Sequence, residues 1–272
     1  MNLLVALNKK YLRHLFNMLI SFDASHHQQT TCYVLSNDIK YVDLELINKH
    51  LQHPLVFHII DYQNNVLNEA KTTYRYPKEV YYRLFAAEYL PLDVNRILYL
   101  DVDIIVLKNL QTFYDTDFEH HYFIGATNIQ KILTTFNNIK NRAPYHAYYL
   151  NTGVLLINVA LLRQEQDMNK LNEYIIKYNH LLILPDQDVL NALYGNKVKL
   201  VSHLLFNLSD RAILKHNLSL KNKVKIDSKW VNEHAHILHF YGKNKPWKKD
   251  YWGILKPFYE KYAHLGINPF DE

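Results

Sequence analysis

Two aspartates at the end of a short apolar run are the residues of this chain best suited to chemistry. The run, Arg96-Ile-Leu-Tyr-Leu-Asp101-Val-Asp103, is typical of a buried strand that ends in two carboxylates. Carboxylates two residues apart at a strand end can both face one hard cation such as Mg2+ or Mn2+. Such an ion would neutralise a diphosphate and stabilise it as a leaving group. Two further Asp-x-Asp pairs occur, at 115/117 and 186/188, so the motif alone is equally compatible with a solvated turn.

One histidine could complete this cation site. The chain has 16 histidines, and His234, His236 and His239 resemble a metal cluster by their spacing. In a strand, however, residues two apart share a face, so His239 faces away from the other two. His239 could instead supply a neutral imidazole to an ion held by the two aspartates. The histidine pairs at 26/27 and 120/121 lie in polar surroundings, and we expect both in surface loops.

A basic turn follows His239 closely. Its sequence is Gly242-Lys-Asn-Lys245-Pro-Trp247. The glycine permits close backbone approach, and a lysine supplies a point charge for phosphate. The turn could therefore bind the same diphosphate that the cation would face. Taken alone, the segment is also typical of a basic surface turn closed by a buried tryptophan.

Alternating strands and helices must position these residues. In the first hundred residues, hydrophobic periodicity predicts strands over Leu3–Leu7, Thr31–Leu35, Leu55–Ile60 and Ile97–Leu100. The predicted helices between them are Tyr11–Phe22, Ile39–Leu51 and Lys78–Tyr89. This alternation indicates an α/β domain with a mostly parallel sheet. Such a sheet binds ligands beyond the carboxyl ends of its strands, which is where Asp101 and Asp103 follow.

The second half of the sequence is less regular. It predicts a strand over Gly153–Val159, a helix over Ala160–Tyr178, a helix over Pro185–Tyr194 and a last strand over Ile237–Tyr241. We expect Asp186 to act as the N-cap of the third of these elements. The stretch Lys243–Tyr262 concentrates lysine, tryptophan and tyrosine and is predicted to be partly helical.

Composition excludes several classes of function. Only six glycines are present, and their positions allow neither GxGxxG nor GxxxxGK[ST], so the dinucleotide fingerprint and the P-loop are absent. Thirty-one Lys and Arg against 26 Asp and Glu leave a net charge of +5, too little for a nucleic-acid stripe. The single cysteine, Cys32, can form neither an intramolecular disulfide nor a cysteine zinc site. The N-terminal apolar run is followed by its charges and not preceded by them, so we expect no signal peptide and a cytoplasmic protein.

Read together, the segments resemble family 8 retaining glycosyltransferases, and within them the bacterial lipopolysaccharide galactosyl- and glucosyltransferases. The resemblance covers about residues 2–247. Its blocks, in order, are Tyr82-Arg83-Leu, Asp101-Val-Asp103, Asn151-Thr-Gly-Val-Leu-Leu-Ile-Asn158, Pro185-Asp-Gln-Asp-Val-Leu-Asn191 and His239-Phe-Tyr-Gly-Lys-Asn-Lys-Pro-Trp247. The implied fold is GT-A, a mostly parallel Rossmann-like sheet for the nucleotide merged with an acceptor-binding half. The implied catalytic domain is 1–247, followed by a basic and aromatic tail at 248–272.

The resemblance also implies roles for single residues. Mn2+ (or Mg2+) would be held by Asp101, Asp103 and His239. The nucleotide and its diphosphate would contact Asn8, Tyr11, Asp101, Val102, Gly242 and Lys245. The donor sugar would contact Arg83, Asn151 and Asp186, and the catalytic positions would be Gln187, Asp186 and Arg83. Gln187 would lie beneath the anomeric carbon. This chain has Asn8-Lys9 where the family often has two acidic residues, and Asn can still pair with a uracil edge.

The implied reaction is transfer of glucose or galactose from a UDP-sugar to an acceptor hydroxyl of a lipopolysaccharide or other surface glycan, with retention. Taken singly, Arg83 could be a surface ion-pair partner, Gln187 a solvated side chain and Tyr11 a packing residue. Two other functions use the same features: a sugar nucleotidyltransferase, which releases pyrophosphate, and a catalytically silent nucleotide-sugar-binding protein.

The tail offers two alternatives of its own. Its lysines Lys248, Lys249, Lys256 and Lys261 would suit weak, peripheral contact with the inner face of a membrane. Alternatively, a C-terminal helix packs Trp252, Leu255, Phe258 and Tyr259 onto the catalytic domain.

Overall fold

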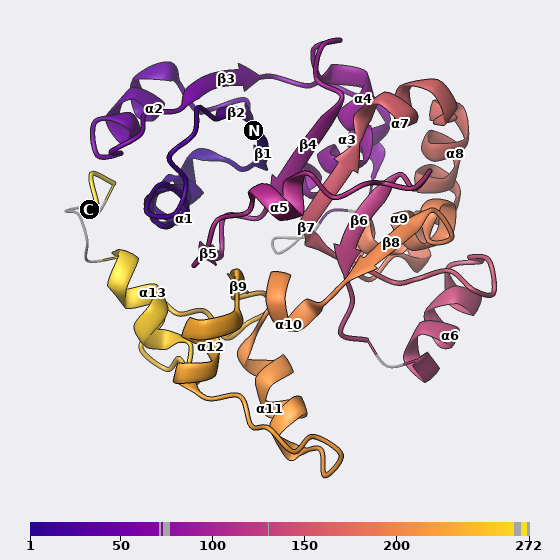
Figure 1. Ribbon diagram of the computed structural model, residues 1–272. Helices are drawn as coiled ribbons and strands as arrows, with labels where there is room; N and C mark the ends of the chain where they lie inside the picture. Colours follow the sequence, from indigo (N-terminus) through magenta and orange to yellow (C-terminus); the bar gives the residue numbers. More distant parts are fainter. Residues whose placement is uncertain (71, 73–76, 130, 264–267, 271–272) are drawn as a thin grey trace.

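A seven-stranded sheet forms the centre of the protein, seen in a computed structural model that describes residues 1–70, 72, 77–129, 131–263 and 268–270 (Figure 1). Every strand of this sheet except β7 runs in the same direction. The mostly parallel α/β sheet predicted from the sequence is therefore confirmed. In spatial order the strands are β3 (Val56–Ile60), β2 (Thr31–Leu35), β1 (Asn2–Ala6), β4 (Arg96–Leu100), β7 (Asn151–Asn158), β6 (Phe123–Ala126) and β8 (Val198–Val201).

A second, two-stranded sheet carries the functional residues. It consists of β5 (Ile104–Val106) and β9 (Ile237–His239), which pair antiparallel with Ile104 opposite His239. Because only three residues separate the end of β4 from the start of β5, the chain between the two sheets is the Asp101-Val-Asp103 segment itself. The pairing of β5 with β9 therefore brings His239 next to the aspartates, although more than 130 residues separate them in the sequence.

Helices cover both faces of the large sheet and surround the small one (Figure 1). The α-helices are α1 (Leu12–Asp23), α2 (Tyr41–Asn48), α3 (Val66–Glu69), α4 (Ala86–Tyr89), α5 (Gln111–Tyr114), α6 (Lys131–Lys140), α7 (Val159–Glu165), α8 (Met168–Tyr178), α9 (Pro185–Tyr194), α10 (His203–Phe206), α11 (Asp210–Leu218), α12 (Ser228–His234) and α13 (Lys256–Ala263). The 3-10 helices are η1 (Lys9–Tyr11), η2 (Lys78–Phe85) and η3 (Asn179–Leu181).

Three clusters of buried apolar side chains follow from this arrangement. Alternate residues of the central strands point to opposite faces, so Leu4 and Tyr99 join η2, α7, α8 and α9 on one side. Leu3 and Leu98 join α1, α2 and α5 on the other side. The third cluster lies between the small sheet, α11, α12 and α13. The C-terminal segment thus shares a core with the strands that carry the site.

Two helix predictions are corrected by local side-chain bonding. The predicted helix Ala160–Tyr178 is broken into α7 and α8, because the side chain of Asp167 accepts a hydrogen bond from the backbone of Lys170 at 3.0 Å and starts a new helix. Asp186 does not cap α9. The residue before that helix is Leu184, and Asp188 instead accepts the backbone N–H groups of Ile183 and Leu184 at 2.7 and 3.1 Å.

A further correction concerns His26, which was expected in a surface loop. Its exposed fraction is 5%, and its ring stacks on Phe22 just beyond the end of α1. The Nδ1 atom lies 3.0 Å from the Phe22 carbonyl, and Nε2 accepts the backbone N–H of Leu110 at 2.7 Å. His27 and His120 are exposed and His121 is half-buried, in line with the expectation for those positions.

The C-terminal helix α13 packs onto α1. Leu255 and Tyr259 are buried, and the amide of Asn17 donates to the Tyr259 hydroxyl at 3.0 Å. Phe258 packs against the third apolar cluster, between the small sheet and α11, α12 and α13, whereas Trp252 is 58% exposed. The part of the predicted tail at 264–267 and 271–272 lies outside the described residues. Among the described helices, none combines the length and apolar character needed to cross a bilayer.

Candidate functional site

Asp101, Asp103 and His239 form the chemical centre of the protein. The Nε2 atom of His239 lies 3.1 Å from an oxygen of Asp103 and 3.6 Å from an oxygen of Asp101. One ligand atom from each residue lies within 4.8 Å of the other two. Two carboxylates and an imidazole are a donor set that suits Mn2+ and related divalent ions. The structure thus brings together the three residues that the sequence predicted as metal ligands.

Gly153 makes room for this group. Its backbone carbonyl accepts the N–H of Asp101 at 2.8 Å, which holds β7 against the end of β4. A Cβ atom at this position would overlap the ring of His239 and would lie 2.5 Å from an oxygen of Asp101. Only glycine therefore fits beside the cluster. In the sequence, Gly153 belongs to the motif Asn151–Asn158, but the position of this motif in the chain does not indicate that Gly153 lies beside the metal ligands.

Arg83 stands behind the cluster and is buried, so its interpretation as a surface ion-pair partner is wrong. Its guanidinium lies 3.2 Å from an oxygen of Asp101 and 3.4 Å from one of Asp186, and it donates to the Thr152 carbonyl at 2.7 Å. It also covers the ring of Tyr99 at 4.0 Å. One buried cation thus links β4, β7 and α9, the three elements that meet at the site.

The charges in this group set one another's protonation. Burial opposes ionisation of Asp103, but Lys245 and His239 outweigh it and hold the pKa of this carboxyl below its usual range. Burial likewise opposes the ionised form of Asp101, and Arg83 and His239 lower its pKa. Burial disfavours the imidazolium of His239, yet the carboxylates of Asp103 and Asp101 raise its pKa to about 8. At Asp186 burial prevails over Arg83 and Thr152, so the pKa is raised.

Asn207, at the end of α10, orients the histidine. Its side-chain oxygen lies 2.9 Å from Nδ1 of His239, and its amide nitrogen donates to the side-chain oxygen of Asn151 at 3.0 Å. Asn207 is 97% buried within this chain of contacts. In the neutral ring, with the Nδ1 proton donated to Asn207, the lone pair of Nε2 faces the two carboxylates. Sequence analysis missed Asn207, because nothing in its neighbourhood distinguishes it from any other asparagine.

The basic turn after β9 closes onto the cluster. Lys245 donates to Asp103, and also to the Phe240 carbonyl at 3.0 Å. Gly242 has φ of 96°, a conformation that favours glycine. Trp247 stacks on His14 of α1 with ring centroids 3.8 Å apart, which fixes the far end of the turn. Lys245, predicted to contact the diphosphate, therefore lies beside Asp103 at the edge of the cluster, and the diphosphate role of Gly242 and Lys245 stays a prediction.

The remaining predicted residues lie around this centre with fewer contacts. Asn8 caps η1 by accepting the backbone N–H of Lys10 at 3.2 Å. Tyr11 is 42% exposed and has its ring 5.9 Å from that of His14, so it is not a core residue. Val102 lies half-buried between the two aspartates, and Gln187 lies half-buried in the first turn of α9 directly after Asp186.

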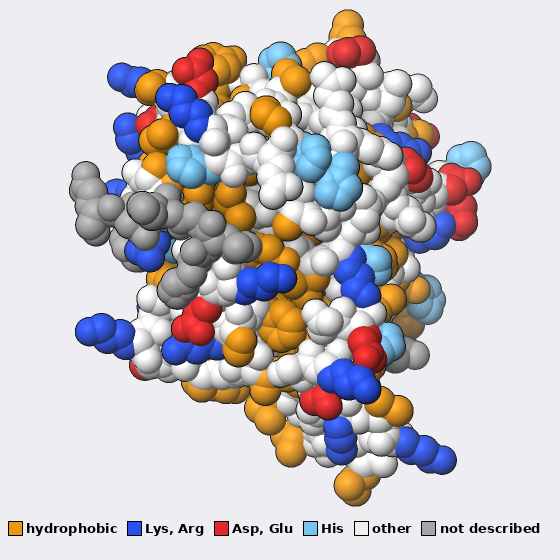
Figure 2. Space-filling model, turned by 60° about the vertical axis from the view of Figure 1, so that its left-hand side comes forward, with side chains coloured by type: hydrophobic (Ala, Val, Ile, Leu, Met, Phe, Trp, Pro, Cys, Tyr) orange, Lys and Arg blue, Asp and Glu red, His pale blue; other side chains and the backbone are white. Residues whose placement is uncertain are grey.

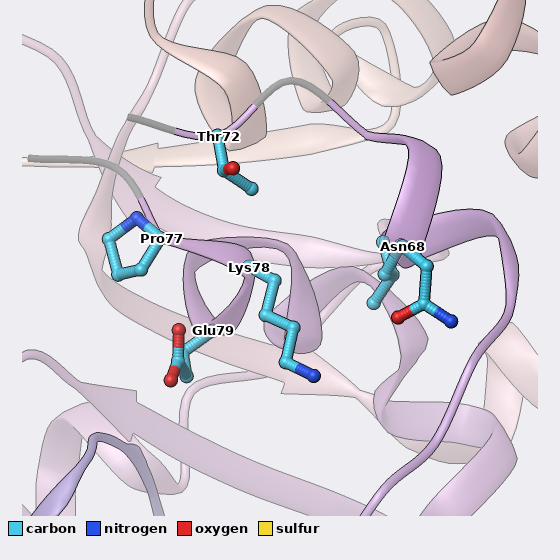
Figure 3. A pocket seen from close by; sticks show the side chains of 6 residues that line it. Asn68, Thr72, Pro77, Lys78 and Glu79 are labelled. Atoms are coloured by element: carbon cyan, nitrogen blue, oxygen red, sulfur yellow. The ribbon is translucent and has the colours of Figure 1, made fainter. Parts of the chain in front are cut away.

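Two of the hollows lined by described residues differ in their distance from the cluster. A cavity of about 310 Å³ lies between α3 and the start of η2, where Asn68, Thr72, Lys78 and Glu79 line it (Figure 3). It contains none of the residues of the metal cluster. A smaller hollow of about 40 Å³ borders the cluster itself and is lined by His239, Tyr241 and Ser209, among others.

Comparisons with known proteins agree with this geometry. The model of glycosyl transferase family 8 matches residues 2–251. The chain is 26% identical over 258 residues to a putative glycosyltransferase of Haemophilus influenzae, which covers 92% of this chain and 73% of that protein. It is 29% identical over 220 residues to the lipopolysaccharide 1,3-galactosyltransferase of Salmonella typhimurium, over 77% of this chain and 60% of the relative.

A solved structure supports the same assignment at the level of the fold. The galactosyltransferase LgtC, in complex with donor and acceptor sugar analogues, superposes with a TM-score of 0.79 at 22% identity, covering 97% of this chain and 95% of that one. This likeness confirms the GT-A fold that the sequence resemblance implied. Because the family model spans all but the last part of the chain, the protein belongs to glycosyl transferase family 8.

Proposed function

We propose that this glycosyltransferase moves a hexose, glucose or galactose, from a UDP-sugar to a hydroxyl group of a glycan or glycolipid, with retention and with the help of a divalent metal. The observation that carries the proposal is the grouping of Asp101, Asp103 and His239 within 4.8 Å, with Lys245 on one side and Arg83 on the other. Two acids, one imidazole and two flanking cations match a metal-bound diphosphate better than a neutral ligand.

The residues present fit a resident Mn2+ (or Mg2+). The absent Cβ of Gly153 leaves space beside the ligands, and Asn207 directs the Nε2 lone pair of His239 toward the carboxylates. When bound, the ion would supply Lewis-acid stabilisation of the departing diphosphate. The proposed nucleotide contacts remain Asn8, Tyr11 and Val102, together with Gly242 and Lys245 for the diphosphate.

The proposed reaction exchanges one bond for another at the anomeric carbon. The bond from this carbon to the diphosphate oxygen breaks, the bond to the acceptor oxygen forms on the same face, and the acceptor proton passes to the leaving oxygen. Lys245 would stabilise the charge that develops on the diphosphate. Asp186, Arg83 and Asn151 would hold the donor sugar, and Gln187 would lie beneath its anomeric carbon. The amide of Gln187 is a poor nucleophile, which favours this front-face path over a covalent intermediate.

The relatives support the choice of substrate class. The Salmonella relative is a lipopolysaccharide 1,3-galactosyltransferase, and the LgtC structure holds donor and acceptor sugar analogues. By analogy we propose a lipopolysaccharide or other cell-surface glycan as acceptor. We also propose a cytoplasmic location, as expected from the sequence.

Product identity tests the proposed function. Purified protein is incubated with a panel of UDP-sugars, with and without Mn2+, and the released products are separated. We expect slow, Mn2+-dependent release of UDP and free hexose from UDP-glucose or UDP-galactose. Release of pyrophosphate would assign a nucleotidyltransferase instead, and binding without any release would assign a silent nucleotide-sugar-binding protein. Once an acceptor is known, NMR of the product gives the configuration of the new glycosidic bond. A β configuration would contradict retention.

A further inference from the structure

The helix α6 has an inverted distribution of polar and apolar side chains. A surface helix normally turns its apolar side chains to the core. In α6 the apolar side chains Ile132, Leu133, Phe136 and Ile139 are 70%, 54%, 66% and 72% exposed. Their spacing places them along one outward stripe of the helix. The helix therefore presents an apolar face to its surroundings.

The inner side of α6 is held by polar bonds. Asn138 donates to the backbone carbonyls of Tyr145 and Ala147 at 3.1 and 3.0 Å. Lys140, at the end of the helix, forms an ion pair of 2.9 Å with the buried carboxylate of Asp188 in α9. The outward apolar side chains are therefore not what holds the helix in place.

Residues 214–225, at the end of α11 and in the loop after it, also expose apolar side chains, although α11 itself buries Ala212 and Ile213 in the third apolar cluster. The apolar side chains Leu214, Leu218, Leu220 and Val224 are 48%, 72%, 100% and 64% exposed. Amide side chains fix the backbone between them. Asn217 pairs with both backbone groups of Ile226 at 2.8 Å, and Asn222 donates to the His216 carbonyl at 3.0 Å. An ordered loop is thus built from polar bonds while its apolar groups face outward.

Apart from Asp210 at the start of α11, both segments lie in stretches of the sequence without acidic residues. The sequence contains no Asp or Glu from 120 to 164, nor from 211 to 226. Alongside the apolar groups, the second segment carries five exposed cations, Arg211, Lys215, Lys221, Lys223 and Lys225. The turn after α6 carries one exposed cation, Arg142, which donates to the Tyr178 hydroxyl at 3.3 Å, and two exposed tyrosines, Tyr145 and Tyr148. Exposed apolar and aromatic side chains among cations, without acids, are typical of surfaces that lie in the interface of an anionic bilayer.

The two segments lie at one end of the molecule, beside the site. In Figure 1 both helices lie in the lower part of the view, α6 at the right and α11 at the bottom centre. Figure 2 shows hydrophobic and basic side chains at the lower end of that view, with acidic side chains also present among them. Lys215 donates to the carbonyl of Asn128 at 3.0 Å, and the amide of Asn128 donates to Tyr241, whose ring lies 5.0 Å from that of His239. The end that carries both apolar faces therefore adjoins the metal cluster.

We infer that the exposed side chains of α6 and of residues 211–225, together the docking end, seat the enzyme on an anionic lipid bilayer. The choice of a bilayer rests in part on the glycolipid acceptor in the proposed function. When the enzyme is bound to the bilayer by its docking end, the metal cluster would lie close to the lipid surface. The C-terminal segment is a weaker candidate for the same task, because α13 turns Tyr259 and Tyr262 into the core and Leu255, just before it, is also buried.

Vesicle flotation tests the docking end. The full chain is mixed with vesicles of phosphatidylcholine containing 30% phosphatidylglycerol, at low salt and in 0.5 M NaCl. One variant combines Phe136→Ser with Ile139→Ser, and a second combines Leu218→Ser with Leu220→Ser. The matched control combines Trp252→Ser with Lys248→Ser in the C-terminal segment, where the side chains are also exposed. Thermal unfolding of every variant shows whether the fold is kept.

The wild type should float with anionic vesicles at low salt and much less in 0.5 M NaCl, because salt screens the cations. Each docking-end variant should bind at least tenfold more weakly, and the control should stay within twofold of the wild type. The inference is overturned if the wild type does not float, or if only the control loses binding. It is equally overturned if the apolar variants change a dimer seen by light scattering and leave flotation unaltered.

Donor hydrolysis in the same variants separates this inference from the proposed function. The four substituted residues of the docking end are not among the site residues, so release of UDP without acceptor should match the wild type in each variant. If the wild type floats with vesicles but releases no UDP from any UDP-sugar, the proposed function is wrong, whereas the inference about the docking end still holds.

Discussion

At the scale of single residues, the position of one proton decides whether His239 can bind a metal. Its Nδ1 atom faces Asn207 at 2.9 Å, and its Nε2 atom faces Asp103 at 3.1 Å. Without an acceptor at Nδ1, the neutral ring would place its proton on Nε2, toward the carboxylate, where it would block the lone pair. Partners of this kind typically change metal affinity by ~10–100-fold.

Asn207→Ala is therefore expected to weaken Mn2+ binding by about 10–100-fold. Asn207→Asp keeps an acceptor at Nδ1 and should stay close to the wild type, while Asn222→Ala, which removes an amide in the loop after α11, serves as the control. Calorimetric titration with Mn2+ measures the affinities, and 15N NMR of the imidazole reports the tautomer. Equal Mn2+ affinity in all four proteins would show that Asn207 has only a packing role.

Lys245 provides a second prediction at this scale. Its ammonium donates to Asp103 and to the Phe240 carbonyl, so it is held at the edge of the cluster before any substrate arrives. Lys245→Ala should lower turnover by about 10–100-fold and weaken UDP binding, because preorganised charge acts most strongly on a leaving group. The neighbouring Lys243, which is exposed, supplies the matched control Lys243→Ala. Wild-type turnover and UDP affinity in Lys245→Ala would make this lysine a surface residue.

The sequence could identify the metal ligands but not the residues that orient them. Asp101 and Asp103 follow an apolar strand, and His239 stands on the required face of another, so residue type and spacing were informative. Asn207 and Gly153 act only through contacts made in three dimensions. Asn207 lies 32 residues from His239 in the sequence, and Gly153 matters because of the space that its missing side chain leaves.

At the scale of elements, His26 links the end of α1 to the start of α5. Its Nε2 accepts the backbone N–H of Leu110, so the neutral ring carries its proton on Nδ1, toward the Phe22 carbonyl. A second proton would have to bind Nε2, which would break the hydrogen bond from Leu110. Burial lowers the pKa of His26 to about 4. The hydrogen bond to the Phe22 carbonyl raises this pKa, whereas the nearby charges of His27 and the N-terminal ammonium lower it further.

This link should make stability fall as the pH falls. The pKa of His26 is lower in the folded than in the unfolded chain, so the unfolded chain takes up the proton first as the pH drops below about 6.5. Between pH 7.5 and 5 the wild type should lose about 1–2 kcal/mol through this residue. Denaturant unfolding at both pH values measures this loss. Between pH 7.5 and 5, the free energy of unfolding of His26→Gln should fall by about 1–2 kcal/mol less than that of the wild type. A loss identical to that of the wild type would contradict the assignment.

Long apolar segments were predictable and short ones were not. The strands β1, β2 and β3 and the helix α1 were found close to their observed bounds, because each has a clear hydrophobic period. The short strands β5 (Ile104–Val106), β6 (Phe123–Ala126) and β8 (Val198–Val201) were missed, since three or four residues carry too little periodicity. The break between α7 and α8 depends on one capping aspartate within an otherwise helical pattern.

At the scale of the whole molecule, segments distant in sequence converge on one point. The cluster draws Asp101 and Asp103 from the connection between the two sheets, His239 from β9 and Lys245 from the turn beyond it. The order of motif blocks along the chain predicted this convergence by resemblance to a family. The small sheet that produces it could not be predicted, because its register arises only when β5 meets β9.

The binding of UDP with and without Mn2+ tests the central claim most directly. The claim is that Asp101, Asp103 and His239 hold a metal ion that carries the diphosphate of the donor. Calorimetric titration of UDP into wild type and into Asp103→Asn, each with Mn2+ and with excess chelator, measures the coupling. The account predicts at least tenfold tighter UDP binding with Mn2+ in the wild type and no such gain in Asp103→Asn. The same UDP affinity in the wild type with Mn2+ and with chelator would contradict it.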